Sequence, residues 1–196
     1  MNPRQFILDS CKESAETKLA VATSCADDIE RAVATIADAY RAKKKVLFCG
    51  NGGSAADAQH LATEMMIRLS HHINRPALGA ISLCTDPSNL TAGGNDIGFE
   101  NVFARNVEGL GNPGDVLIGI STSGNSKNVL LALEKAHAMS MKTIGFLGGT
   151  GGKMKPLCDV SIVVPSTNVQ RIQEGHIMIG HIIFELVEEV LYGAQG

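Results

Sequence analysis

Residues 46–66 read Val-Leu-Phe-Cys-Gly-Asn-Gly-Gly-Ser-Ala-Ala-Asp-Ala-Gln-His-Leu-Ala-Thr-Glu-Met-Met, and this stretch decides the fold. The apolar run at residues 46–49 predicts a buried strand. Residues 50–54 form a loop with little side-chain bulk, and residues 55–66 have helical composition. A glycine loop that opens a helix offers unpaired N–H groups and a positive dipole end to an anion. Neither the dinucleotide motif nor the P-loop fits, so the stretch predicts another kind of site for a charged small molecule.

Strands and helices alternate in the chain after this unit. The pattern predicts four further strands, at residues 77–83, 115–120, 142–147 and 160–164. It predicts helices at residues 99–110, 126–139 and 169–191, a helix-prone stretch at 87–92 and a turn at 93–96. Continuous apolar strands separated by helices are typical of a parallel sheet covered on both faces. We therefore expect an α/β three-layer sandwich with a five-stranded parallel sheet, and ligands at the carboxyl ends of its strands.

Two amphipathic helices are expected before the first strand, within residues 3–42. The apolar positions that recur at helical spacing are Phe6, Ile7, Cys11, Ala15 and Leu19, and then Ile29, Ala32, Val33, Ile36 and Tyr40. Ser24, followed three residues later by Asp27, is a candidate N-cap for the second helix. These helices either pack on the chain's own sheet or pair with a partner subunit, and the pattern leaves both alternatives open.

Composition excludes several classes of protein. The chain has 196 residues, of which 44% are hydrophobic, which suits one core and a single domain. A formal net charge of −3 gives no basic surplus for binding nucleic acid. Five scattered cysteines without a C-x-x-C motif favour free thiols in a reducing cytoplasm. No apolar run reaches the roughly 20 residues of a membrane span, and no signal peptide is present, so we expect a cytoplasmic protein without a membrane partner.

The loop at residues 121–126, Ser-Thr-Ser-Gly-Asn-Ser, carries four hydroxyl groups in six residues and directly precedes a predicted helix. Hydroxyls and backbone N–H groups at a helix start can together hold the oxygens of a phosphate without lysine or arginine. The alternative is a polar turn in which Ser126 is an ordinary N-cap. The position at a strand's carboxyl end, beside the glycine loop at residues 50–54, favours phosphate binding.

His60 and Glu64 lie four residues apart on a predicted helix and therefore share one face. Such a pair can bind a metal or lie on the surface, and spacing alone favours the surface pair. On the last helix, His181 lies among isoleucines and is expected to be largely buried. Gln173 is eight residues from His181, about 12 Å along the helix, whereas His176 is the easier partner for Gln173. Spacing therefore leaves open which histidine is functional.

Four stretches carry a resemblance to known proteins. They are residues 49–54 (Cys-Gly-Asn-Gly-Gly-Ser), 94–96 (Gly-Asn-Asp), 119–126 (Gly-Ile-Ser-Thr-Ser-Gly-Asn-Ser) and 171–176 (Arg-Ile-Gln-Glu-Gly-His). Together they resemble the SIS (sugar isomerase) domain family of phosphosugar-binding proteins and, within it, the phosphoheptose isomerases. The resemblance covers essentially the whole chain. It implies a single SIS domain over residues 1–196, with a flavodoxin-like or Rossmann-like sheet.

The resemblance implies roles for individual residues. The substrate-binding residues would be Asn51, Gly52, Gly53, Glu64, Asn95, Asp96, Ser121, Thr122, Ser123, Ser126 and Gln173, with the phosphate on the four hydroxyl residues of the 121–126 loop. The ligands of one Zn²⁺ per subunit would be His60, Glu64, Gln173 and His181. Residues 1–42 would pack at the core of a homotetramer, residues 43–196 would form the sheet domain, and active sites would lie at subunit interfaces. Some family members carry an acid where this chain has Gln170.

The implied reaction is an aldose–ketose isomerisation of a small sugar phosphate. It would convert sedoheptulose 7-phosphate to D-glycero-D-manno-heptose 7-phosphate, the first step towards ADP-heptose and the lipopolysaccharide core. Such chemistry needs a base beside the carbonyl and an acid or metal at the enediol oxygen. We expect Glu64 to be the base and His181 the acid. The alternative is a non-catalytic SIS protein that associates with the replication initiator, a type that lacks an acid at the position of Glu64.

Overall fold

The computed structural model describes residues 1–193 and contains one five-stranded parallel sheet, as the sequence predicts. The strands are β1 (Val46–Gly50), β2 (Ala80–Ser82), β3 (Val116–Ser121), β4 (Lys142–Gly148) and β5 (Val160–Val164). They lie in the order β2-β1-β3-β4-β5. All four pairings are parallel, with Phe48 beside Ser82 on one side and beside Ile118 on the other. The chain therefore reverses its direction of travel across the sheet between β1 and β3.

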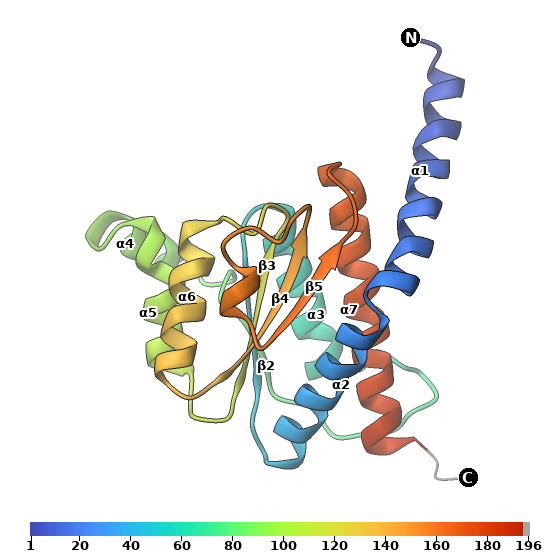
Figure 1. The fold of residues 1–196 in the computed structure, drawn as a ribbon. Coiled ribbons are helices and arrows are strands. Elements are labelled where there is room, and N and C mark those ends of the chain that lie inside the picture. The colour runs from blue at the N-terminus through green and yellow to red at the C-terminus, as the bar shows by residue number, and fades with distance from the viewer. Residues whose placement is uncertain (194–196) are drawn as a thin grey trace.

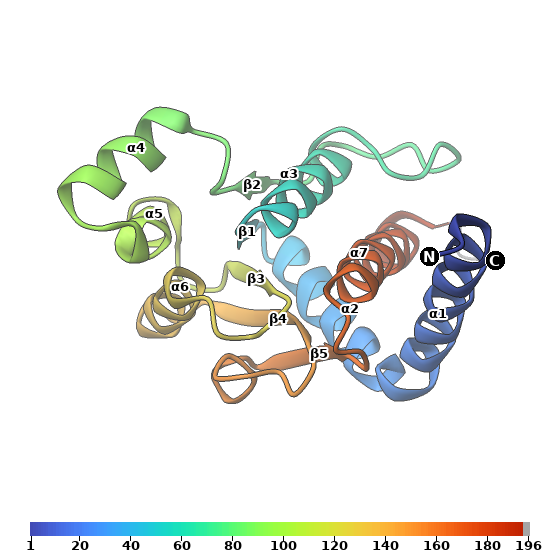
Figure 2. The same ribbon diagram turned by 90° about the horizontal axis from the view of Figure 1, so that it is seen from above.

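Helices cover both faces of the sheet and make a three-layer sandwich (Figure 2). The helices are α1 (Pro3–Ser24), α2 (Ala26–Arg41), α3 (Gly53–Met66), α4 (Pro87–Asp96), α5 (Val102–Leu110), α6 (Lys127–Ala138) and α7 (Val169–Tyr192), with short 3-10 turns η1 (Phe99–Asn101) and η2 (Lys155–Leu157). One core cluster joins α2, α3 and α7 to the sheet, and includes Phe48 against Phe184 with ring centroids 5.7 Å apart. The second cluster joins α5 and α6 to the other face, where Leu47 lies. Alternate residues of β1 thus point to opposite layers.

The candidate loops lie at the point where the strand order reverses. The connection after β1 leads to the edge strand β2, whereas β3 lies on the opposite side of β1. The loop after β1 and the loop after β3 therefore diverge at the same edge of the sheet. Open parallel sheets bind ligands in this place, beyond the carboxyl ends of the strands. The predicted anion-binding loops at residues 50–54 and 121–126 both lie there.

The first helix extends away from the body of the molecule (Figure 1). Of its 22 residues only Thr17 and Val21 are buried, while Leu8 is 58% and Leu19 71% exposed. It is attached mainly to α7, where Ser14 Oγ donates a hydrogen bond to Glu174 Oε2 at 2.6 Å. In contrast, α2 buries its apolar face against the sheet. Within residues 1–193, no helix combines the length and apolar character of a membrane span.

Three local predictions were wrong. The expected turn at residues 93–96 belongs to α4, because Gly93 packs against Val102, where a Cβ would lie 2.8 Å from a methyl group. The strand expected at residues 77–83 is shorter, and pairs with β1 over residues 80–82. Ser24 does not cap α2, because its hydroxyl donates back to Ala20 O at 2.8 Å.

Candidate active site

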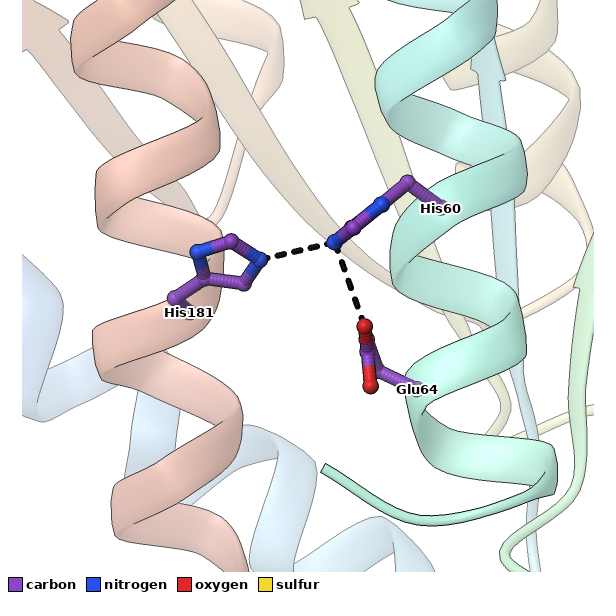
Figure 3. Close-up of side chains that lie close together, drawn as sticks. All are labelled: His60, Glu64 and His181. Atoms are coloured by element: carbon purple, nitrogen blue, oxygen red, sulfur yellow. Dashed lines mark hydrogen bonds and ion pairs between the residues drawn. The ribbon is translucent and has the colours of Figure 1, made fainter. Parts of the chain in front are cut away.

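His60, Glu64 and His181 converge between α3 and α7 (Figure 3). The His60 Nε2 atom lies 2.8 Å from His181 Nε2 and 3.2 Å from Glu64 Oε1. His60 and Glu64 are one turn apart on α3 and both face α7. The His60 side chain is 47% exposed and that of Glu64 22%. His60 and Glu64 are therefore not the isolated surface pair that spacing favoured, because His181 from another helix joins them.

The close approach of α3 and α7 depends on a glycine beside the cluster. Gly180 lies directly against Leu61, and a Cβ at position 180 would be 2.6 Å from Leu61 Cδ2. The absence of a side chain there lets the two helix backbones come together. Because the next residue is His181, the same contact brings its ring within reach of His60.

The donor set of this cluster fits a divalent metal. One ligand atom from each of the three residues lies within 4.8 Å of the other two. Two imidazoles and one carboxylate form a common zinc ligand set that leaves a further position open. The two Nε2 atoms face each other, and one of them must be unprotonated to accept the hydrogen bond from the other. That nitrogen has the lone pair that a metal requires.

Two other polar residues of α7 have different surroundings. The Gln173 amide lies against Gly53, at the start of α3. His176 is completely buried, and its Nε2–H donates to Leu147 O at 2.9 Å. The interpretation of His176 as the easier partner for Gln173 is therefore wrong, because its ring points into the core. The expected burial of His181 is also wrong, since that side chain is only partly buried.

The hydroxyl groups of the 121–126 loop differ in exposure: Ser121 is buried, and Ser123 Oγ accepts a hydrogen bond from the Asn125 N–H group at 3.2 Å. Ser121 Oγ and Ser126 Oγ lie 2.9 Å apart, Thr122 is half-buried and Ser123 is exposed. Ser126 occupies the N-cap position of α6 but makes no side-chain capping bond. The alternative of an ordinary N-cap therefore does not describe its hydroxyl. The loop keeps its hydroxyl groups beside the unpaired N–H groups of the α6 start, a geometry suited to an anion.

An amide pair joins the loop at residues 50–54 to the start of α6. Asn51 and Asn128 exchange two side-chain hydrogen bonds, of 2.9 and 2.8 Å. A cavity of about 390 Å³ opens beside them, and its lining residues are Asn51, Phe99, Glu100, Ser126, Lys127 and Asn128. Neither Lys127 nor Asn128 was a candidate from the sequence; the one available signal was their place at the start of a helix after a hydroxyl-rich loop.

A larger cavity, of about 670 Å³, lies at the opposite end of the sheet. Its lining includes three consecutive lysines, Lys43, Lys44 and Lys45, and the amino ends of the strands. The Lys45 ammonium group is already paired with the carboxylate of Asp115. Because ligands of open parallel sheets bind at the carboxyl ends of the strands, the smaller cavity is the candidate ligand site.

Asn95 and Asp96 are not brought to the cluster within one chain. They end α4, which lies on the opposite side of the molecule from α7 (Figure 1). Both side chains are exposed, and Asn95 Nδ2 donates to Asp96 Oδ1 at 2.7 Å. Gly52 and Gly53 are exposed at the start of α3, where the positive φ of +56° at Gly52 requires glycine.

Asp57 is a further acid on the same face of α3, one turn before His60. Burial raises the pKa of its carboxyl to about 6, and the neighbouring His60 partly opposes that shift. The Asp57 Oδ2 atom is buried and has no hydrogen-bond partner among residues 1–193. The spacing of three residues from His60 was the sequence signal for this residue.

Comparisons with known proteins agree with this geometry. Residues 11–148 match the SIS domain family. A phosphoheptose isomerase from Chlorobaculum tepidum is 53% identical over 188 residues, which cover 95% of this chain and 90% of that protein. A phosphoheptose isomerase from Nitratiruptor is 59% identical over 152 residues, 78% of this chain and 80% of that protein.

Solved structures extend the similarity to three dimensions. The phosphoheptose isomerase from Neisseria gonorrhoeae superimposes with a TM-score of 0.89 at 39% identity, covering 95% of this chain and 98% of the other. The phosphoheptose isomerase from Francisella tularensis gives a TM-score of 0.89 at 34% identity, covering 96% and 100% of the two chains. The chain therefore belongs to the SIS domain family and, within it, to the phosphoheptose isomerase enzymes.

Proposed function

We propose that this chain converts sedoheptulose 7-phosphate to D-glycero-D-manno-heptose 7-phosphate, as an early step towards ADP-heptose for lipopolysaccharide. The observation that carries the proposal is the convergence of His60, Glu64 and His181 between two helices. An aldose–ketose isomerase must move a proton between adjacent carbons and stabilise the enediol oxygen. A carboxylate and an imidazole side by side supply a base and an acid for these steps.

Glu64 is the base that removes the proton beside the carbonyl, and returns it to the neighbouring carbon. Its carboxylate is only partly exposed, which strengthens its interactions with the sugar. His181 protonates and deprotonates the sugar oxygens, since it lies across the gap on α7. His60 fixes the positions of Glu64 and His181 relative to each other, because its Nε2 atom contacts both.

His60, Glu64 and His181, together with Gln173, would hold one Zn²⁺ in each subunit. The bound ion would polarise the sugar carbonyl as a Lewis acid. The support for Gln173 is its position on the same helix as His181 and against the start of α3. A carboxylate bound to a metal is a weaker base, so either Glu64 would leave the ion when substrate binds, or the ion would mainly organise the site.

The phosphate end of the substrate would bind at the loop at residues 121–126, with Asn51, Gly52 and Gly53 along the sugar chain. Asn95 and Asp96 would also contact the sugar chain, and in a homotetramer a neighbouring subunit would complete the site. The exposed apolar residues of α1 are the support for such an assembly. The alternative of a non-catalytic protein bound to the replication initiator is not favoured, since the acid at position 64 is present.

The decisive assay incubates the purified protein with sedoheptulose 7-phosphate, with and without a chelator, and follows aldoheptose phosphate by NMR. We expect conversion in the untreated protein and its loss on chelation, with recovery when Zn²⁺ is returned. A metal-loaded protein that forms no aldoheptose phosphate would overturn the proposed reaction.

The Glu64→Gln variant tests the catalytic assignment. We expect kcat to fall at least about a hundredfold, the usual contribution of a positioned general base, while the protein remains folded. Glu189→Gln is the matched control, because Glu189 forms a similar pair with His72 at 2.9 Å on the surface. Near-normal turnover by Glu64→Gln would remove Glu64 from the mechanism.

A further inference from the structure

The end of α3 is closed by a buried arginine. The last carbonyl groups of a helix lack partners within the helix. Arg75 provides them: its Nη2 donates to Glu64 O at 2.9 Å, and its Nη1 donates to Met65 O at 2.8 Å. The first of these carbonyls belongs to the backbone of the proposed catalytic base. Arg75 thus holds α3 at the residue whose position matters most.

The same guanidinium group is bound to α7. Arg75 Nε donates to Glu188 Oε1 at 2.6 Å, and both side chains are completely shielded from solvent. The Glu188 carboxylate also accepts bonds from the backbone N–H groups of Leu69, at 3.2 Å, and Ser70, at 2.8 Å. Burial raises the pKa of Glu188, but the bonds from Ser70, Arg75 and Leu69 outweigh it and lower the pKa overall. The carboxylate is therefore ionised and fully paired.

Helix geometry links this ion pair to the cluster. Glu188 follows His181 by seven residues, or two turns, so the two side chains leave α7 on the same face. On α3, Arg75 holds the carbonyl of Glu64 itself. One rigid bridge therefore joins the helix of the base to the helix of the acid.

A buried ion pair is a costly way to add stability. Desolvation consumes much of its Coulomb attraction, and apolar residues of similar volume often serve as well or better. What a planar guanidinium bound to two carbonyls and a carboxylate adds is a fixed geometry. Catalytic groups need placement to within about 0.5 Å, which such supporting contacts provide.

We propose that Arg75 and Glu188 are positioning residues that set the separation and rotation of α3 and α7, and so the geometry of the His60–Glu64–His181 cluster, without touching substrate. This inference rests on the proposed function of the cluster. An ion pair that lies outside the site would thus influence turnover and metal affinity as well as stability.

Arg75→Lys is the first test, since lysine keeps the charge but cannot reach both carbonyls and the carboxylate. We expect kcat to fall about tenfold or more and Co²⁺ or Zn²⁺ affinity to fall by a similar factor, as for other groups that orient ligands. KM should change by less than about threefold, because the loops at residues 50–54 and 121–126 are not involved. Affinity is measured by chelator competition, and the ligand geometry by the visible spectrum of bound Co²⁺.

Lys45→Met is the matched control. The Lys45–Asp115 bridge is also largely buried, but it joins the amino ends of β1 and β3, at the opposite end of the sheet. Its loss should lower the melting temperature and leave kcat and metal affinity unchanged below the melting transition. If Arg75→Lys behaves in the same way as Lys45→Met, the positioning role is excluded.

The double variant Arg75→Met with Glu188→Leu separates positioning from the cost of an unpaired charge. It removes both charges together, so we expect melting close to wild type but kcat still reduced about tenfold. Full activity in this variant would overturn the proposal. If the wild-type protein fails to isomerise the heptose phosphate, the proposed function falls, while Co²⁺ affinity and spectrum still decide on the bridge.

Discussion

Two histidines five residues apart on α7 have opposite environments. His181 lies at the edge of the helix pair and contacts His60 at 2.8 Å. His176 faces the sheet, where burial lowers its pKa to about 4, although its hydrogen bond to Leu147 O partly opposes that shift. Both are surrounded by isoleucines in the sequence, so the apolar pattern could not separate them. The difference arises from the direction in which α7 lies across β4, which is a tertiary property.

The buried His176 predicts a pH dependence of stability. The unfolded chain binds this proton with a pKa near 6.5, whereas the folded chain binds it only near 4. The neutral, buried ring therefore makes its full contribution to the free energy of unfolding above pH 6.5. This contribution is lost as the pH falls towards 4, and the loss is about 2 kcal/mol at pH 5. Urea unfolding of wild type and His176→Gln at pH 7.5 and pH 5 measures it.

We expect the variant to lose less stability than wild type between these pH values, because glutamine keeps a donor for Leu147 O but takes up no proton. The same exchange at the exposed His71 controls for the removal of an imidazole. An equal loss in wild type and His176→Gln would contradict the prediction.

At the scale of elements, the sequence predicts the strands and the candidate ligand loops. It does not predict which side chains join one element to another. The runs of β1, β3, β4 and β5 are mostly apolar, so these strands and their membership of a buried parallel sheet follow from the sequence, whereas their order in the sheet does not. The pairing of Asn51 with Asn128 joins residues 77 positions apart, and no local pattern encodes it. Gly93 and Gly94 suggested a turn, whereas helix packing against Val102 required the small residue at 93.

The amide pair predicts a specific defect in binding. Asn128→Ala removes both hydrogen bonds to Asn51 and leaves the β1 loop without its support from α6. We expect KM for the sugar phosphate to rise about tenfold, with a smaller effect on kcat, because a buried polar group without its partner costs about 1–3 kcal/mol. Steady-state kinetics and a thermal melt measure the two effects.

The control is Asn106→Ala, which breaks a comparable amide contact, of 2.7 Å, between Asn89 and Asn106. That contact joins α4 to α5 and involves no residue of the β1 loop. A similar rise in KM in both variants would show that the effect is general destabilisation, contrary to the prediction.

At the scale of the whole molecule, α1 is a helix whose apolar residues stay exposed within one chain. Leu8, Cys11, Ala15 and Leu19 follow one another at helical spacing and are all exposed. The opposite face of the helix is used, through Ser14, to contact α7. The sequence left open whether the leading helices pack on their own sheet or on another subunit, and α2 takes the first role while α1 is available for the second.

Leu8→Glu tests the second role. A charge placed within an apolar contact between subunits costs several kcal/mol, so we expect association to weaken by at least about tenfold and smaller species to form. The fold should be unaffected, because Leu8 is 58% exposed in the single chain. Size-exclusion chromatography with light scattering measures the mass, and Asn74→Glu, in an exposed loop, is the control. An unchanged mass would remove this face from the assembly.

The two halves of the histidine contact are 121 residues apart in the chain, and α7 is synthesised after all five strands. Besides His181, α7 supplies Ile179, Ile183 and Phe184 to the core that covers one face of the sheet. Until α7 is made, that face of the sheet and the His60–Glu64 pair therefore both lack their partner. Completion of the core and assembly of the histidine cluster are thus the same step of folding.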